Sequence, residues 1–173
     1  MRPVALFAAF AIATAAPTFA AGAAPAVKSG LVSAGRLNSA DLQGLWGNIV
    51  PTEAGTVYNF TRMQPDGSGA DTLVVKSAKT KTPSVTVQRF KWYFDEAQQE
   101  LIQTVTGFSD SKKQARQTVN VGDQSVLSVK MWRDNGTGRT VLEFIDSQGT
   151  KNGYVRLDEN QIDPDIRHIL DKQ

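Results

Sequence analysis

From residue 42 to residue 157 the chain consists of short segments rich in Val, Ile, Thr, Phe, Tyr and Trp, separated by turn-forming residues. Strand-like segments repeated every 8–12 residues or so are typical of all-β folds. Apolar and polar residues alternate within the segments, as at Leu127, Val129 and Met131, so each strand has one apolar face. We expect eight or nine strands, at about 42–50, 56–63, 71–77, 85–94, 100–108, 114–121, 125–132, 139–145 and 153–157.

The turns between these segments predict hairpins. Asp66-Gly67, Asn135-Gly136 and Asn152-Gly153 are residue pairs that readily adopt positive φ in tight turns. No segment between the expected strands is long and periodic enough to form the crossover helix that parallel neighbours need. The sheet is therefore predicted to be antiparallel, and parallel α/β folds are excluded.

An open sheet of this many strands would leave two edges with unpaired backbone groups, and closure removes both. We therefore expect an all-β fold, an antiparallel up-and-down β-barrel of about eight or nine strands. A β-sandwich is the alternative, since the same strand spacing serves it. After the last strand, Asp163 as N-cap and Pro164 at the first position predict a short C-terminal α-helix.

The first 20 residues have the pattern of a secretory signal peptide. A basic residue precedes an apolar run, and Thr18-Phe19-Ala20 places small residues where signal peptidase cleaves, so we expect cleavage after Ala20. As a helix, the apolar run rises only about 20 Å and is too short to span a bilayer, so no stable membrane insertion is expected. We expect a periplasmic or secreted protein, with a flexible tether over 21–36 and one folded domain over 37–173.

Gly44-x-Trp46, which follows a predicted helical turn and opens the first strand, resembles the Gly-x-Trp start of lipocalins. An aromatic strand then leads to the Asp66-Gly67 hairpin, and a strand carrying Trp92 follows. Over about residues 42–157 the chain resembles the bacterial secreted lipocalin-like proteins, which are calycin-type β-barrels. The resemblance implies that Gly44, Trp46 and Arg156 close one end of the barrel, with Arg156 over the Trp46 ring.

The lipocalin-like resemblance implies a binding function. An eight-stranded barrel has an interior that either holds one small ligand or is filled by side chains, and both outcomes stay open here because the inward candidates are large. In the first case we expect a non-catalytic binding protein for a small apolar or amphipathic ligand. The candidate ligand-binding residues of the interior or its rim are Tyr58, Phe60, Phe90, Trp92, Phe94, Met131 and Trp132.

The alternative function is a protein-interaction module, such as an inhibitor or immunity protein that acts on another envelope protein. In that case the barrel interior is packed, and loops at about 78–84, 109–113 and 133–138 make the contact. A ligand-lined interior favours the first function, and projecting loops over a packed interior favour the second.

The composition excludes several classes of site. The chain has no Cys and one His, which excludes thiolate metal sites, cysteine nucleophiles and histidine-rich metal sites, so we expect no metal and no cofactor. His168 is predicted to form surface ion pairs with Asp165 and Asp171 rather than to act as a general base. With a net charge of only +2 and an export signal, the chain is expected to bind no nucleic acid. We therefore expect that the protein is not an enzyme.

Overall fold

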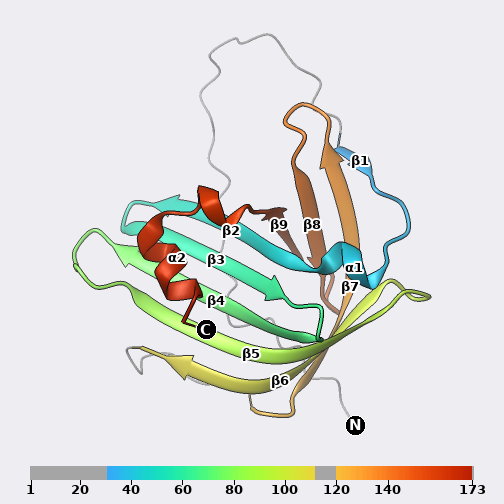
Figure 1. Cartoon of the computed structure of the whole chain (residues 1–173), viewed down its shortest axis with the longest axis horizontal. Coiled ribbons are helices and arrows are strands. Elements are labelled where there is room, and N and C mark those ends of the chain that lie inside the picture. Colours follow the sequence, from blue (N-terminus) through green and yellow to red (C-terminus); the bar gives the residue numbers. More distant parts are fainter. Residues whose placement is uncertain (1–30, 112–119, 173) are drawn as a thin grey trace.

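The computed structural model describes residues 31–111 and 120–172 of the chain (Figure 1). Within these residues it consists mainly of antiparallel strands, with two short α-helices and one turn of 3-10 helix. In chain order the elements are β1 (Leu31–Ser33), α1 (Ser39–Leu42), β2 (Gly44–Thr52), β3 (Gly55–Met63), β4 (Ser68–Ser77), β5 (Ser84–Asp95), β6 (Glu100–Asp110), β7 (Gln124–Asp134), β8 (Thr140–Ile145), β9 (Lys151–Arg156), η2 (Glu159–Gln161) and α2 (Pro164–Leu170).

Strands β2 to β9 form a closed antiparallel barrel. Each strand pairs with the next along the chain, and β9 returns to pair with β2 through Trp46 opposite Arg156 and Gly47 opposite Val155. Closure pairs the edges that an open sheet would expose. The predicted up-and-down barrel is confirmed, and its architecture is compatible with a lipocalin-like fold; the sandwich alternative is wrong.

The predicted strand positions agree closely with β2 to β9, and the one exception is the strand expected at 114–121. Residues 112–119 lie outside the described part of the chain, and Val121 and Gly122 form a turn before β7 begins. Gly122 has a φ of +93°, a left-handed conformation that suits glycine and that a strand residue does not adopt. The predicted end of that strand at Val121 was therefore wrong.

The extra strand β1 lies within the segment that we expected to be a flexible tether. Leu31–Ser33 pair with Trp132–Asp134 of β7, and Ala34 N–H donates to the Met131 carbonyl at 2.9 Å. Pairing of β6 with β7 extends only to Ser128, so the remaining edge of β7 accepts β1. The tether prediction is thus wrong for Leu31–Ser33, while the predicted signal peptide and the rest of the tether up to residue 30 lie outside the described residues.

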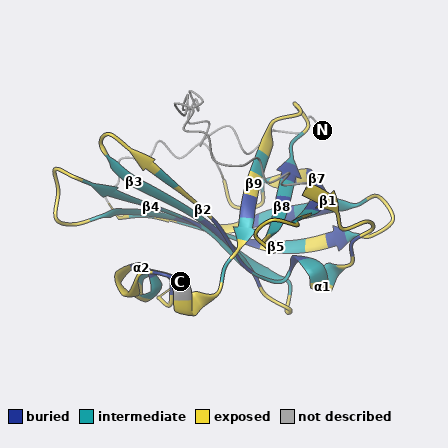
Figure 2. Ribbon diagram, turned by 90° about the horizontal axis from the view of Figure 1, so that it is seen from above, coloured by how far each residue is buried: buried dark blue, intermediate teal, exposed yellow. Residues whose placement is uncertain are grey.

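The C-terminal helix α2 covers the outer face of one side of the barrel. Asp163 accepts a hydrogen bond from the Asp165 N–H as N-cap, and Pro164 occupies the first turn, as predicted. Ile166 and Leu170 pack against Leu45, Phe60 and Val74 of the sheet. Figure 2 shows α2 beneath β2, β3 and β4, on the side of these strands away from β8 and β9. No helix in the described residues is long and apolar enough to cross a membrane.

Candidate functional site

The side chains that point into the barrel follow from strand alternation. Trp46, Met63 and Phe90 belong to the central core cluster, which also takes side chains from β6, β7, β8 and β9. Their cross-strand partners lie on the same face of the sheet, because directly opposite residues in an antiparallel pair share a face. Trp46 lies opposite Thr61, and Thr61 lies opposite Asp71, so both polar side chains point into the barrel.

Four polar side chains form a belt across the barrel interior, which we call the polar belt: Asn59, Thr61, Asp71 and Tyr154. The Thr61 hydroxyl donates a 2.7 Å hydrogen bond to Oδ1 of Asp71, and Asn59 Nδ2 donates to the Tyr154 hydroxyl at 3.0 Å. Thr61 is 3% exposed and Tyr154 is 5% exposed. Hydrogen bonds inside a barrel fix the positions of these groups, since an unpaired buried polar group is costly.

Asp71 is the titrating group of the polar belt. Desolvation raises the pKa of its carboxyl to about 7, and the hydrogen bond from Thr61 opposes that rise only in part. The pKa of the Tyr154 phenol is also raised, first by desolvation and then by the negative charge of Asp71. Asp71 as a whole is half-buried, and its side chain faces the barrel interior opposite Thr61. Near neutral pH this carboxyl changes between a hydrogen-bond donor and an anionic acceptor.

The strands separate at the end of the barrel beyond the polar belt. Pairing between β2 and β9 stops at Gly47 and Val155, although β2 continues to Thr52. Pairing between β6 and β7 stops at Thr104, although β6 continues to Asp110. Figure 2 shows β2, β3 and β4 diverging from β8 and β9 in this direction. Within residues 31–111 and 120–172, no strand pairing therefore encloses the inward faces of these strand ends.

Apolar side chains line these separated ends, and we call them the apolar rim: Val50, Val57, Leu73 and Val75. Val50, Val57 and Val75 lie opposite one another on β2, β3 and β4, and Leu73 lies opposite Asn59. All four are half-buried, whereas the side chains at the other end of the barrel are fully packed. The interior thus changes from a packed apolar core, through the polar belt, to a partly exposed apolar rim.

The sequence-predicted binding residues do not form one site. Phe90, Phe94 and Met131 lie in the packed core, and Trp92 packs against it from a half-buried position. Their placement in the interior agrees with the prediction, but in this structure they fill the closed end of the barrel.

The predicted placement of Tyr58 and Phe60 in the barrel interior is wrong, because both side chains face outward. They belong to the cluster under α2, and their rings stack with centroids 6.2 Å apart. The pairing of Thr61 with Trp46 fixes this orientation of β3. Trp132 also lies on the outer face, since Met131 beside it points inward and β1 pairs alongside at Ser33.

The residues assigned to barrel closure do lie together. The Arg156 guanidinium carbon is 5.2 Å from the Trp46 ring centroid, and Arg156 Nη2 donates to the Gln43 carbonyl at 2.7 Å. Trp46 Nε1 donates to the Leu42 carbonyl at 2.8 Å, which connects the ring to α1. Gly44 has a φ of +117°, and a Cβ there would lie 3.3 Å from Arg156 Nη2, so this contact favours glycine.

The polar belt was missed at the level of sequence. Its signal was present: Asp71, Leu73 and Val75 are spaced two apart and share one face of a predicted strand. An acidic residue at an apolar-face position indicates either a strand end or an inward carboxyl. His168, the imidazole considered above, is exposed on α2, and no group of three or more His, Cys, Asp or Glu residues in the described segments is arranged to hold a metal ion.

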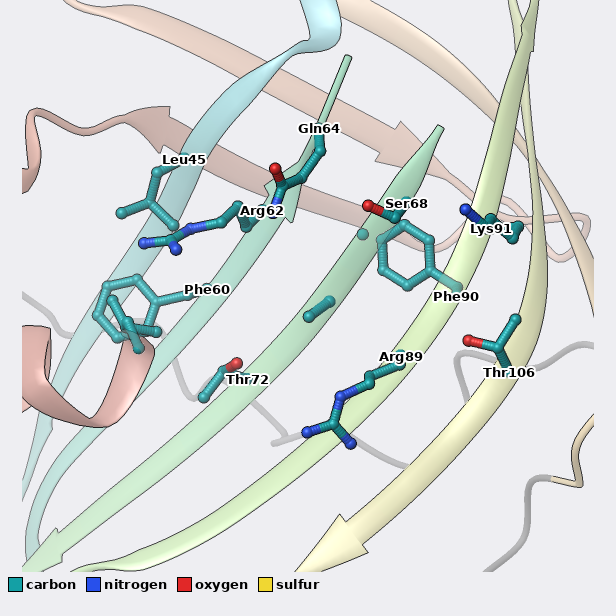
Figure 3. A pocket seen from close by; sticks show the side chains of 13 residues that line it. Leu45, Phe60, Arg62, Gln64, Ser68, Thr72, Arg89, Phe90, Lys91 and Thr106 are labelled. Atoms are coloured by element: carbon teal, nitrogen blue, oxygen red, sulfur yellow. The ribbon is translucent and has the colours of Figure 1, made fainter. Parts of the chain in front are cut away.

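A second feature is a pocket on the outer face, which we call the outer pocket (Figure 3). Its volume is about 180 Å³, and β2 to β6 and the end of α2 line it. Leu45, Phe60 and Leu170 provide apolar groups, and Arg62, Arg89 and Lys91 provide three cations. It lies on the opposite side of the sheet from the polar belt, so the two features are separate.

Comparison with known proteins gives no match to a family model, to a curated protein or to a solved structure.

Proposed function

We propose that this chain is a non-catalytic, lipocalin-like binding protein of the periplasm or the secreted fraction, with a small amphipathic ligand. The apolar part of the ligand lies among Val50, Val57, Leu73 and Val75, and its polar end points toward the Thr61–Asp71 pair. The observation that carries the proposal is the order of the inward-facing groups, with a half-buried apolar rim above a hydrogen-bonded polar belt.

This order matches the usual composition of a small-molecule site, in which apolar walls supply most of the contact and a few polar groups orient the ligand. The rim side chains are half-buried, so a ligand that covers them removes apolar area from water at about 25 cal/mol per Å². The Asp71 carboxyl and the Tyr154 hydroxyl supply a polar end for an alcohol, amide or acid group. An aromatic cluster of the kind first expected does not carry this site, since Phe90, Phe94 and Met131 are packed in the core.

The test is a titration of the full chain with N-phenyl-1-naphthylamine, an apolar dye whose emission rises in apolar surroundings. We expect saturable binding, and we expect Leu73→Arg to weaken it by about tenfold or more, because the new charge lies in the apolar rim. Ile49→Arg is the matched control, since Ile49 is 50% exposed and lies on the outer face of β2, opposite Tyr58.

The two arginine variants separate the outcomes. Loss of dye binding in Leu73→Arg with unchanged binding in Ile49→Arg supports the interior site, provided that both variants keep the circular dichroism of the parent. Val75→Phe is the second variant if Leu73→Arg does not fold, since it fills the rim without adding a charge. Equal dye binding by the parent, Leu73→Arg and Val75→Phe would overturn the proposal and favour the alternative of a packed barrel that acts through its loops.

A further inference from the structure

The outer pocket holds two arginines that flank one small residue. Arg62 on β3 lies opposite Ala70 on β4, and Ala70 lies opposite Arg89 on β5, so the three share the outer face of the sheet. In Figure 3 the side chains of Arg62 and Arg89 lean the same way across the strands, Arg62 toward Leu45 and Arg89 toward Thr72. Only the methyl group of Ala70 stands between the two positions, which leaves room for a bound group.

The positive charge of this pocket is only partly compensated. Arg62 pairs with Glu159 at 2.9 Å, and the Glu159 side chain is 51% exposed. Arg89 is half-buried, and no hydrogen bond or ion pair joins it to another residue of the described segments. Lys91 adds a third cation at the pocket wall. The two guanidinium groups share the outer face on either side of β4, so their like charges disfavour each other, and an anion bound between the two strands offsets this.

A local irregularity of the sheet contributes to the pocket. The pairing of β5 with β6 shifts between Arg89 and Phe90, because Arg89 lies opposite Gly107 while Phe90 lies opposite Val105. Thr106 is thus the extra residue of a β-bulge, and it lines the pocket beside Arg89. Bulges re-aim the side chains next to them and are over-represented beside functional sites. The bulge therefore places a hydroxyl and a guanidinium at the same edge of the pocket.

The opposite wall of the pocket is apolar. Leu45 and Phe60 come from the sheet, and Leu170 comes from the end of α2, so the position of α2 helps to define the pocket. A volume of about 180 Å³ is below the roughly 300–1,000 Å³ of sites for drug-sized ligands, which limits the occupant to a small molecule.

We propose that the outer pocket binds a small organic oxyanion, a carboxylate or phosphate carried on a short apolar group. The oxyanion lies over Ala70 between Arg62 and Arg89, where the planar guanidinium fork donates two parallel hydrogen bonds to its oxygens. The apolar group lies against Leu45, Phe60 and Leu170. This site is separate from the interior site proposed above, because its residues point to the other face of the sheet.

The experiment measures binding of hexanoate, hexyl phosphate and hexanol to the full chain by backbone amide chemical shifts. We expect hexanoate or hexyl phosphate, or both, to shift the amides of Ala70, Thr72 and Arg89 with saturation, and hexanol to bind at least about tenfold more weakly because it lacks the charge. Comparison of the two anions identifies the preferred head group, and inorganic phosphate at the same concentration tests whether a free anion suffices without the apolar group.

Variants locate the site. Arg89→Gln is expected to weaken binding of the preferred anion by about tenfold or more, since it removes a charge-assisted hydrogen bond. Ala70→Leu keeps every charge but fills the space between the arginines, and it is expected to abolish binding. Arg133→Gln is the matched control, because Arg133 is exposed and does not line the pocket.

Three results would overturn the proposal: equal binding of hexanol and the two anions, equal binding by Arg89→Gln and Arg133→Gln, or shifts confined to Leu73 and Val75. The last result would assign the anion to the barrel interior. Anion binding that survives in Leu73→Arg but is lost in Ala70→Leu supports the outer pocket, whatever becomes of the interior site.

Discussion

The Thr61 hydroxyl donates a 2.7 Å hydrogen bond to the Asp71 carboxyl across neighbouring strands inside the barrel. This pair joins the packed core to the partly exposed rim, and its carboxyl has a pKa raised to about 7. The ionisation of one side chain therefore connects the stability of the barrel with the polarity of the proposed ligand site.

The raised pKa of Asp71 predicts an unusual dependence of stability on pH. The pKa of Asp71 is about 7 in the folded protein, against 3.8 for an ordinary aspartate, so the folded state holds an extra proton between these two values. The Asp71 contribution to stability therefore falls as pH rises from about 4 to above 7. Over this pH range the free energy of unfolding falls by at most about 4 kcal/mol. This figure is an upper bound, because Asp71 as a residue is only half-buried. Asp71→Asn is expected to match the parent near pH 4 and to be increasingly more stable than the parent from pH 5 to pH 8.

Urea unfolding of both proteins at a series of pH values measures this difference. A stability gap between parent and Asp71→Asn that does not change from pH 5 to pH 8 would contradict the assignment of the titration to Asp71.

Trp46 is fully buried beneath Arg156, and its replacement tests the closed end of the barrel. Trp46→Ala is expected to lower the free energy of unfolding by about 3–5 kcal/mol, as large-to-small substitutions of core aromatic residues do. Tyr93→Ala is the control, since Tyr93 is 63% exposed, and it is expected to change stability by about 0.5 kcal/mol or less. Similar values for the two variants, measured by chemical denaturation, would reject the role of Trp46 in closure.

Phe60 is 1% exposed and packs under α2 on the outer face of β3. Phe60→Ala is expected to cost about 3–5 kcal/mol and to speed hydrogen exchange at the amides of α2, because the helix loses its main aromatic contact. Ile49→Ala, at an exposed position on the outer face of β2, serves as control. If exchange in α2 stays at the parental rate in Phe60→Ala, the helix is not held by this side chain.

Substitution of Gly69 tests how tightly β4 and β5 pack against each other. A Cβ at this position would lie 2.6 Å from Phe90 Cζ and 2.8 Å from the Arg62 carbonyl oxygen, closer than real side chains approach. Gly69→Ala is therefore expected to destabilise the barrel by about 1–3 kcal/mol through overpacking. The double variant Gly69→Ala/Phe90→Leu should recover part of this loss, and no recovery would place the clash on the Arg62 backbone instead.

The strand order was predictable because β-branched and aromatic segments recur between turn pairs, and hairpin connections leave few ways to arrange them. The orientation of β3 was not predictable from alternation alone. That strand has apolar residues on both faces, with Val57 and Met63 pointing inward and Tyr58 and Phe60 pointing to α2. Only the contact with a distant helix tells which face is covered from outside.

The polar belt was not predictable for a related reason. Asp71 stands near the expected start of a strand, where an acidic residue is ordinary, and Tyr154, which completes the polar belt, lies far along the chain. Only barrel closure brings Asn59 and Tyr154 within 3.0 Å of each other. Likewise, Leu31–Ser33 form a strand because β7 extends beyond β6, a relation that the local sequence does not contain.

The most direct test of ligand binding in the barrel interior is native mass spectrometry of the protein. The protein is purified without organic solvent from the cells that naturally produce it. The same sample is measured after denaturation and extraction. Ligand binding in the barrel interior predicts a small-molecule adduct that is lost on denaturation and is absent from Leu73→Arg prepared in the same way. A bare chain, or a chain bound to another polypeptide and to no small molecule, would contradict the claim.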